Sequence, residues 1–296
     1  MSNILVTGGT GFLGRHLVPK LQALGHQVFI SNTKERNLDN ILLLLDLPKL
    51  DYIFHLACYT KAGDWCLHHS GEQWEVNQAI NTNMLKYWRL HQPQAKMLAM
   101  GTSCSYSCDL PMVEGNYMSG EPDEGLYTYA MTKRMLLQGL KAIHKQYGLD
   151  YSYFIPSTLY GSGYDSGDRH FIFDLCRKIK NGVKGESVTL WGDGTQRREL
   201  IHVDDAVKLM ITLMDTDVSV VNLSSGKDYS IREYALELCK LLGYDESNIL
   251  YDESKYVGVH RKNLSVNLIR ELAPDFTFTS LSEGLKQLVA WEVTNA

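Results

Sequence analysis

The sequence predicts an α/β protein built on a doubly wound parallel sheet, with a smaller α/β part towards its C-terminal end. Two observations support this prediction. Short apolar segments alternate with helical stretches through the first half of the chain, and a glycine-rich turn joins the first such segment to the first helix. Strands that alternate with helices of this length form parallel sheets, because each crossover between neighbouring parallel strands needs a helix.

The elements of this first half follow one another in a regular order. Residues 4–6 form an apolar strand, and Leu13, Leu17, Leu21 and Leu24 then recur at helical spacing. Gly148 stands where the last helical stretch needs a C-cap. The other predicted strands lie at 28–30, 52–57, 96–103 and 150–157, and the helices between them at 75–91 and 129–148. This order is typical of a Rossmann-type sheet.

The second half is less regular. Beyond about residue 156 the pattern weakens, and residues 161–170 and 191–199 are predicted as loops. The sequence has no internal repeat, low-complexity segment or long linker, so we expect two domains packed together. The predicted limits are 1–155 with about 200–225 for the first domain, and about 156–199 with 226–296 for the second.

The composition argues against several classes of protein. At 296 residues and 44% hydrophobic, the chain can bury one large core or two smaller ones. A formal net charge of -5 without a long lysine or arginine run argues against nucleic-acid binding. The six cysteines lack zinc-site spacing, so no metal is expected. The longest aliphatic run, at 41–45, cannot span a membrane and the first residues lack a leader pattern, so we expect a reduced, cytoplasmic protein.

The glycine turn has the residues that a dinucleotide pyrophosphate requires. Gly8, Gly11 and Gly14 recur at three-residue intervals between the first strand and the first helix. Glycine permits a tight turn and a close backbone approach, and the helix N-terminus presents unpaired N–H groups to an anion. A glycine-rich turn without a ligand is the alternative, which the strand and helix on either side disfavour.

The segment after the second strand indicates which dinucleotide binds. An NAD site usually places a carboxylate at this strand end, where it meets the ribose hydroxyls. Here the strand ends in Ser31 and Asn32, and Lys34 and Arg36 follow. The two cations can hold a 2′-phosphate, which favours NADPH, although NADH and a merely solvated loop remain open.

Tyr129 and Lys133 are the first candidates for catalysis. They stand four residues apart in a predicted helix, so they share one face. The charge of Lys133 is expected to lower the pKa of the Tyr129 phenol, so that it can exchange a proton near neutral pH. Thr102, Ser103 and Cys104 follow a predicted strand, at the edge where parallel sheets bind ligands. The alternative is a tyrosine and a lysine that are ordinary surface residues.

Together with His-Leu-Ala at 55–57, these residues resemble the extended short-chain dehydrogenase/reductases of the NAD-dependent epimerase/dehydratase family, which act on nucleotide sugars. The resemblance implies that Thr102, Tyr129 and Lys133 form the catalytic group. It also implies that the second domain binds the nucleotide sugar, and that helices 77–91 and 127–147 pair across a homodimer. The implied cofactor contacts are Gly8, Thr10, Gly11, Phe12, Leu13, Gly14, Asn32, Lys34, Arg36, Leu56, Ala57, Tyr129, Lys133 and Pro156.

Within this family the chain is similar to the GDP-L-fucose synthase subgroup. The similarity rests on the segments GTSCSY at 101–106, WGDGTQRRELIHVDDAV at 191–207 and RKNLSVNLIREL at 261–272. It implies that NADPH reduces a nucleotide-linked, GDP-type 4-keto-6-deoxy sugar after epimerisation at carbons 3 and 5. Cys104 and His170 would then move the protons at these two carbons. The implied substrate contacts are Ser103, Thr158, Trp191, Arg198 and Lys262.

The chain departs from that subgroup at three places. Thr102 replaces a serine but keeps its hydroxyl, Thr158 replaces an asparagine, and the loop that ends at His170 is shorter. The alternatives for His170 are a loop or a capping histidine.

Two further readings of the function stay open. If Cys104 is a buried, structural residue, the protein is a 4-reductase or a 4-epimerase that does not epimerise carbons 3 and 5. A dinucleotide-binding sensor without catalysis is disfavoured, because the pair of Tyr129 and Lys133 is retained. Dehydration is disfavoured, because Ser103 and Cys104 stand where 4,6-dehydratases have Asp-Glu. The sugar, hexose or heptose, and the base of the nucleotide are undecided.

Overall fold

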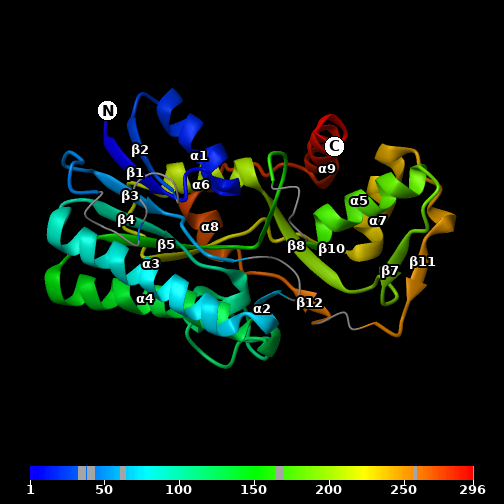
Figure 1. The fold of residues 1–296 in the computed structure, drawn as a ribbon, viewed down its shortest axis with the longest axis horizontal. Coiled ribbons are helices and arrows are strands. Elements are labelled where there is room, and N and C mark those ends of the chain that lie inside the picture. The colour runs from blue at the N-terminus through cyan, green and yellow to red at the C-terminus, as the bar shows by residue number, and fades with distance from the viewer. Residues whose placement is uncertain (33–37, 39–43, 61–64, 165–169, 256–258, 296) are drawn as a thin grey trace.

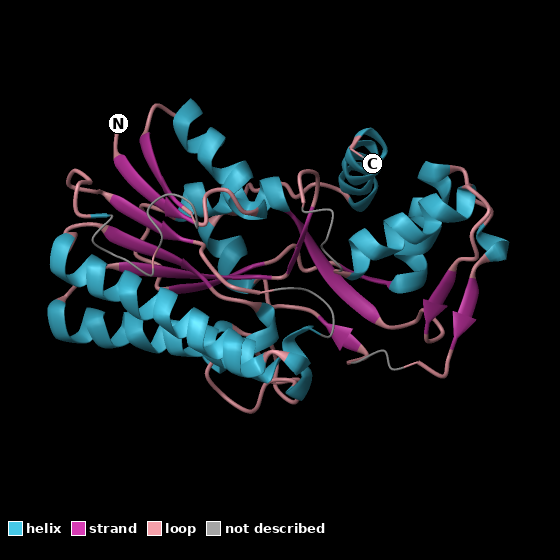
Figure 2. Ribbon diagram, viewed as in Figure 1, coloured by secondary structure: helices cyan, strands magenta, loops and turns pink. Residues whose placement is uncertain are grey.

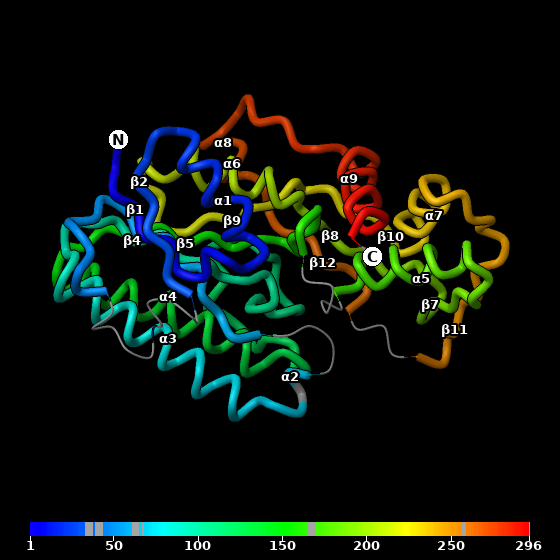
Figure 3. The backbone as a smooth tube through the Cα atoms, turned by 45° about the horizontal axis from the view of Figure 1, so that its top comes forward, coloured from blue at the N-terminus to red at the C-terminus, as the bar shows by residue number. Residues whose placement is uncertain are grey.

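The computed structural model describes residues 1–32, 38, 44–60, 65–164, 170–255 and 259–295. Figure 1 shows two lobes: a larger one with the N-terminus and a long twisted sheet, and a smaller one around α5 (Phe171–Val183) and α7 (Ile231–Leu242). The C-terminal helix α9 (Leu281–Thr294) lies where the two lobes meet (Figure 3).

Six parallel strands form the sheet of the larger lobe, in the order β2-β1-β3-β4-β5-β9 (Figure 2). The predicted fold class is therefore confirmed. β1 lies between β2 and β3, so the connection after β1 leads towards one edge of the sheet and the connection after β3 leads towards the other edge. At this reversal a crevice opens between the carboxyl ends of β1 and β3. The strands are β1 (Asn3–Thr7), β2 (Gln27–Ser31), β3 (Tyr52–His55), β4 (Lys96–Met100), β5 (Tyr151–Pro156) and β9 (Val220–Leu223).

Helices cover both faces of this sheet. In Figure 1, α3 and α4 lie side by side below the sheet, whereas α1, α6 and α8 lie on the opposite face. Each face has its own apolar core, one around Tyr87 and Trp88 of α3 and the other around Leu17 and Leu21 of α1. The helices are α1 (Phe12–Ala23), α2 (Trp65–His68), α3 (Ser70–His91), α4 (Tyr127–Tyr147), α6 (Val203–Leu213) and α8 (Asn267–Leu272).

The sequence of α4 explains where this helix ends and which side it buries. Gly148 adopts the left-handed conformation, with φ of 71°, and closes the helix as predicted. Leu136 and Leu140 are buried against the sheet. Tyr147, the last residue of the helix, is 46% exposed. Its ring lies under the Arg89 guanidinium of α3, with 5.2 Å between the guanidinium carbon and the ring centre.

The central strand of the smaller lobe is β8 (Arg197–His202), which pairs with β6, β10 and β12. The predicted loop at 191–199 is wrong for its last three residues, since they begin this strand. Buried Glu199 accepts hydrogen bonds from the Gly226 and Leu264 N–H groups at 3.0 and 2.9 Å, which joins β8 to distant segments. The other strands are β6 (Thr158–Tyr160), β7 (Thr189–Trp191), β10 (Asp228–Ser230), β11 (Leu250–Asp252) and β12 (Arg261–Lys262).

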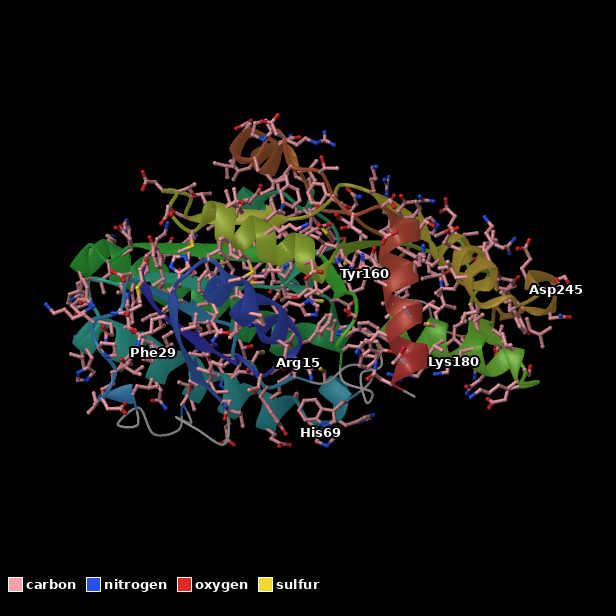
Figure 4. All side chains as sticks on the ribbon, turned by 90° about the horizontal axis from the view of Figure 1, so that it is seen from above. Arg15, Phe29, His69, Tyr160, Lys180 and Asp245 are labelled. Carbon is pink, nitrogen blue, oxygen red and sulfur yellow. The ribbon has the colours of Figure 1, made fainter. Side chains whose placement is uncertain are left out.

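Helix α9 joins the smaller lobe to the strand that leads out of the larger one. Gly284 packs so closely on Tyr160 that an added Cβ would lie 2.0 Å from the phenolic oxygen. On α5, Lys180 donates a hydrogen bond of 3.0 Å to the Glu292 carbonyl oxygen. Figure 4 shows Tyr160 and Lys180 beside this helix. The close approach at Gly284 depends on the absence of a side chain there.

We predict that Gly14→Ala disrupts the glycine turn. A Cβ at position 14 would lie 2.4 Å from the Gly8 carbonyl oxygen and 2.6 Å from the Gly9 backbone, so the turn or the helix must shift. The free energy of unfolding should fall by about 1–3 kcal/mol, and the affinity for a dinucleotide should fall with it. Chemical denaturation and fluorescence titration measure the two quantities.

Gly71→Ala is the matched control for this change. Gly71 lies near the start of α3, and a Cβ there meets no atom within 4 Å. Its stability should be unchanged or slightly higher, since alanine favours helix. Equal stability of Gly14→Ala and the wild type would contradict the packing described for the turn.

Candidate active site

A cavity of about 460 Å³ opens at the carboxyl ends of β1, β3, β4 and β5. The glycine turn, the residues after these strands, α4 and the start of α5 line it. The predicted site residues among its lining are Gly8, Gly11, Phe12, Leu13, Gly14, Leu56, Thr102, Ser103, Cys104, Tyr129, Lys133, Pro156, Thr158 and His170. Residues far apart in the sequence, on both sides of the crevice, thus meet in one cavity.

The cofactor side of the cavity is built for an anion and for close backbone contact. The first turn of α1 has no acidic residue, and its N-cap, Gly11, offers no side chain to the N–H groups. A Cβ on Gly8, whose φ is 69°, would lie 2.9 Å from the Ala57 nitrogen, so only glycine fits where β1 and β3 diverge. These features suit the pyrophosphate of a dinucleotide.

The turn after β4 presents the first reactive groups. Residues Ser103–Ser105 form a 3₁₀ turn that begins at Thr102. The Thr102 hydroxyl oxygen accepts a hydrogen bond of 3.3 Å from the Cys104 N–H. The same hydroxyl lies near the Tyr129 phenol and acts to lower its pKa. A single side chain therefore connects the turn that bears Cys104 with the helix that bears Tyr129.

Tyr129 is held in its protonated form. Burial raises its pKa well above the usual value, the nearby Cys58, Cys104 and Tyr117 raise it further, and the Thr102 hydroxyl opposes the shift. The expected lowering of this pKa by Lys133 is therefore wrong for the structure. The physical reason is that the phenol loses contact with water, which penalises the phenolate more than neighbouring groups compensate.

Lys133 lies in a buried polar network beside the cavity. The residue is 4% exposed, and its Nζ donates a hydrogen bond of 3.0 Å to the Met100 carbonyl oxygen. Its neighbour His55 bonds through Nδ1 to the Thr7 hydroxyl at 2.8 Å and through Nε2 to Asn81 Oδ1 at 3.1 Å. Burial, assisted by the Lys133 charge and opposed by the hydrogen bond with Asn81, lowers the pKa of His55 to about 4. A neutral histidine thus lies next to a lysine ammonium.

A chain of hydroxyl groups joins the turn after β4 to α4. The Thr102 N–H donates to the Tyr117 hydroxyl at 3.3 Å, and this hydroxyl lies 3.1 Å from that of Tyr153. The Tyr153 hydroxyl donates to the Lys133 carbonyl oxygen at 2.7 Å. Since a carbonyl oxygen can only accept, the proton of Tyr153 points to α4 and Tyr117 donates to Tyr153.

His170 reaches the cavity from the smaller lobe. It is the residue that precedes α5, and it lines the cavity together with Phe173. Cys104 approaches from the larger lobe, so the two predicted proton-transfer groups belong to different sides of the cavity. Thr158, at the start of β6, lines it as well.

Several predicted contacts do not line this cavity in the part of the chain that the structure describes. Trp191 is 57% exposed at the end of β7. Arg198 and Lys262 are paired neighbours on β8 and β12, and the Arg198 guanidinium donates to the Val259 carbonyl oxygen at 2.7 Å. The remaining predicted cofactor contacts outside the lining are Thr10, Asn32 and Ala57, while Lys34 and Arg36 lie outside the described residues.

Comparison with known proteins agrees with this architecture. Residues 4–231 match the model of the NAD dependent epimerase/dehydratase family. The chain belongs to this family. It is 30% identical to GDP-L-fucose synthase of Escherichia coli (strain K12) over 316 residues, which covers 99% of this chain and 97% of that protein.

Two other proteins are similar over most of the chain. GDP-L-colitose synthase of Yersinia pseudotuberculosis is 27% identical over 281 residues, which covers 90% of this chain and 91% of that protein. The structure of a GDP-L-fucose synthetase from Naegleria fowleri bound to NADP superposes with a TM-score of 0.87 at 21% identity, covering 99% of this chain and 93% of that one.

Family motifs did not reveal every group in the cavity. Cys58, Thr60 and Cys66 line it, and the Cys58 thiol donates a hydrogen bond of 3.2 Å to Asn77 Oδ1. Cys58 follows the His-Leu-Ala tripeptide at the end of β3, which is a neighbour of β4 in the sheet. Because carboxyl ends of parallel strands share one edge, this position could have been included.

Two absences apply to the described residues. No helix there is both long and apolar enough to cross a bilayer. Within the same residues, no group of three or more histidine, cysteine and acidic side chains is arranged to hold a metal ion.

We predict that the Tyr129 phenol of the free protein stays protonated beyond the range of ordinary tyrosines. Its pKa is raised, so ionisation should begin only above the usual value of about 10. Ultraviolet difference titration of the wild type against Tyr129→Phe measures this group alone. A difference signal with a midpoint below that value would contradict the burial effect.

Proposed function

We propose that this protein is an NADPH-dependent enzyme that epimerises and then reduces a nucleotide-linked 4-keto-6-deoxy sugar, with GDP as the nucleotide. One observation supports this most: Cys104, His170, Tyr129 and Lys133 line a single cavity together with the glycine turn. The names of the relatives, which are GDP-sugar synthases, support the nucleotide and the class of sugar. The sugar itself, hexose or heptose, stays open.

Epimerisation requires an acid and a base on two sides of the sugar ring. A keto group at carbon 4 acidifies the C–H bonds at carbons 3 and 5, since the resulting enolate is delocalised onto oxygen. In our proposal one of Cys104 and His170 removes a proton, and the other returns a proton to the opposite face. Their approach from different lobes suits this division of roles.

Reduction then uses the groups on α4. NADPH, when bound, supplies a hydride to the carbonyl carbon. Tyr129 donates its phenolic proton to the carbonyl oxygen, and Thr102 holds the same oxygen by a hydrogen bond. The raised pKa of Tyr129 favours this direction, because the acid form is the one present before the reaction. Lys133, one helical turn away, provides a positive charge next to the phenol and the cofactor.

The cofactor side of the proposal rests on the glycine turn and the end of β2. The uncapped N-terminus of α1 would hold the pyrophosphate. Asn32, Lys34 and Arg36 would hold the 2′-phosphate that distinguishes NADPH from NADH. The similar structure from Naegleria fowleri contains NADP, which supports this choice.

We assign the nucleotide-sugar side to the smaller lobe, along the predicted domain limits. Arg198 and Lys262 face the same side of neighbouring strands, since they are paired in register, and they provide two cations for a diphosphate. Ser103 and Thr158 would contact the sugar, and the exposed Trp191 would contact the nucleotide. We also propose that α3 and α4 pair with a second copy of the chain. Exposed apolar side chains on these helices, which support this pairing, are Trp74, Leu90 and Met135.

The epimerisation is tested by turnover in deuterated water. We predict a reduced product with deuterium at carbons 3 and 5, analysed by mass spectrometry and NMR. Cys104→Ser and His170→Asn should each lower this exchange by about 100-fold or more. Cys108→Ser is the matched control, because Cys108 is exposed and is not a lining residue of the cavity.

The rival functions give different results in the same experiment. A reduced product without deuterium at either carbon would indicate a 4-reductase, with Cys104 structural. A 4-epimer formed without net consumption of NADPH would indicate a simple epimerase. NADPH binding without any product would indicate a dinucleotide sensor.

A further inference from the structure

Arg134 follows Lys133 in α4, yet it is not among the lining residues of the cavity. It is 5% exposed, and its guanidinium donates only to main-chain carbonyl oxygens among the described residues. Nε and Nη2 donate to the Ser105 oxygen at 3.0 and 2.6 Å. Nη1 donates to the Gly120 oxygen at 2.8 Å, and Nη2 also donates to the Ser119 oxygen at 3.0 Å.

Burying the Arg134 guanidinium has a free-energy cost. A buried cation loses its hydration, and these hydrogen-bond partners are neutral carbonyls and not a carboxylate. An apolar side chain of the same length would pack here without that cost. Only the planar guanidinium provides several N–H donors in fixed directions, which can hold several oxygen atoms at once.

The oxygen that receives two of these hydrogen bonds belongs to the reactive turn. Ser105 is the last residue of the 3₁₀ turn and directly follows Cys104. Its own hydroxyl donates to the Ala130 carbonyl oxygen of α4 at 3.0 Å. The far end of the turn is therefore fastened to α4 twice, through the Arg134 side chain and through the Ser105 side chain.

The near end of the turn is fastened to the same helix. There the Thr102 N–H connects through the Tyr117 and Tyr153 hydroxyls to the Lys133 carbonyl oxygen. Helix α4, which bears Tyr129, thus holds the segment that bears Thr102 and Cys104 from both sides. If either connection is lost, the distance between the phenol and the turn is no longer fixed.

We propose that Arg134 is a positioning residue, which holds the turn of Thr102, Ser103 and Cys104 in register with Tyr129 so that both proton-transfer steps act on one bound sugar. This inference rests on the proposed function for its catalytic consequence. Its structural consequence, an ordered turn, is independent of that function and is tested separately.

The structural test uses Arg134→Met, which keeps the length of the side chain and removes its donors, and Arg134→Lys, which keeps only the charge. In the wild type the Ser105 and Tyr106 N–H groups are hydrogen-bonded within the turn, to the Thr102 and Ser103 oxygens, both at 3.2 Å. Hydrogen exchange of these two amides should be at least about 10-fold faster in Arg134→Met. Arg134→Lys should be intermediate.

Alkylation of two of the cysteines that line the cavity, Cys104 and Cys58, with iodoacetamide provides an internal control. Cys104 lies in the turn, whereas Cys58 lines the same cavity but follows β3. Arg134→Met should accelerate modification of Cys104 and leave the rate at Cys58 unchanged. Equal acceleration at both residues would show general loosening, and it would overturn the proposal. Unchanged exchange and unchanged alkylation would overturn it too.

The kinetic test separates positioning from folding. For Arg134→Met, kcat should fall by about 100-fold while KM for NADPH changes less than about two-fold, because misplacement affects the reaction more than binding. Leu209→Ala is the matched control: it removes a buried side chain of α6, on the other face of the sheet, and should lower the midpoint of thermal unfolding without this split. The same split in Leu209→Ala would overturn the proposal.

The outcomes distinguish this proposal from the proposed function. If the wild-type protein turns over no nucleotide-linked 4-keto sugar, the proposed function is wrong, and the exchange and alkylation results still decide whether Arg134 orders the turn. If the wild type turns over the sugar and Arg134→Met has an equal kcat, only the role of Arg134 is wrong.

Discussion

The active cavity depends on one constraint, which is the fixed placement of the turn after β4 against α4. The glycine turn and the cofactor side are held by the sheet itself, since they follow its first strand. The turn at 102–105 follows β4 in the same way, and hydrogen bonds to α4 hold it as well. Its hydrogen bonds to α4 run through Tyr117 and Tyr153 on one side and through Ser105 on the other. The proposed chemistry needs a phenol, a hydroxyl and a thiol around one sugar, and these bonds hold the segments that bear them.

The charges in the buried network are arranged for proton donation. Tyr129 is partly exposed in the cavity, yet desolvation raises its pKa and keeps it neutral, and burial beside a cation lowers the pKa of His55. Lys133 lines the same cavity as Tyr129, and its Nζ is hydrogen-bonded to a main-chain oxygen. A phenol in this setting keeps its proton until a stronger acceptor arrives. A ketone that gains a hydride becomes an alkoxide, which is such an acceptor.

The sequence was most informative where function requires a local pattern. The glycine turn, the strands around it and the spacing of Tyr129 and Lys133 are all local, and the structure brings them into one cavity. The pKa of Tyr129 was predicted in the wrong direction, because the sequence does not show how deeply a phenol is buried. The start of β8 was missed, since buried contacts of Glu199 with distant segments stabilise it. No sequence pattern pointed to Arg134, because its hydrogen-bond partners are main-chain oxygens, which every sequence has.

In the proposed reaction, the phenolic proton of Tyr129 goes to the sugar oxygen as hydride arrives at the carbon that bears this oxygen. The most direct measurement is the single-turnover rate of NADPH oxidation by Tyr129→Phe, with cofactor and a GDP-linked 4-keto-6-deoxy sugar both saturating. We predict a rate lower by about 100-fold or more, with the affinity for NADPH retained. A rate equal to that of the wild type would contradict it, because the proton would then come from another group.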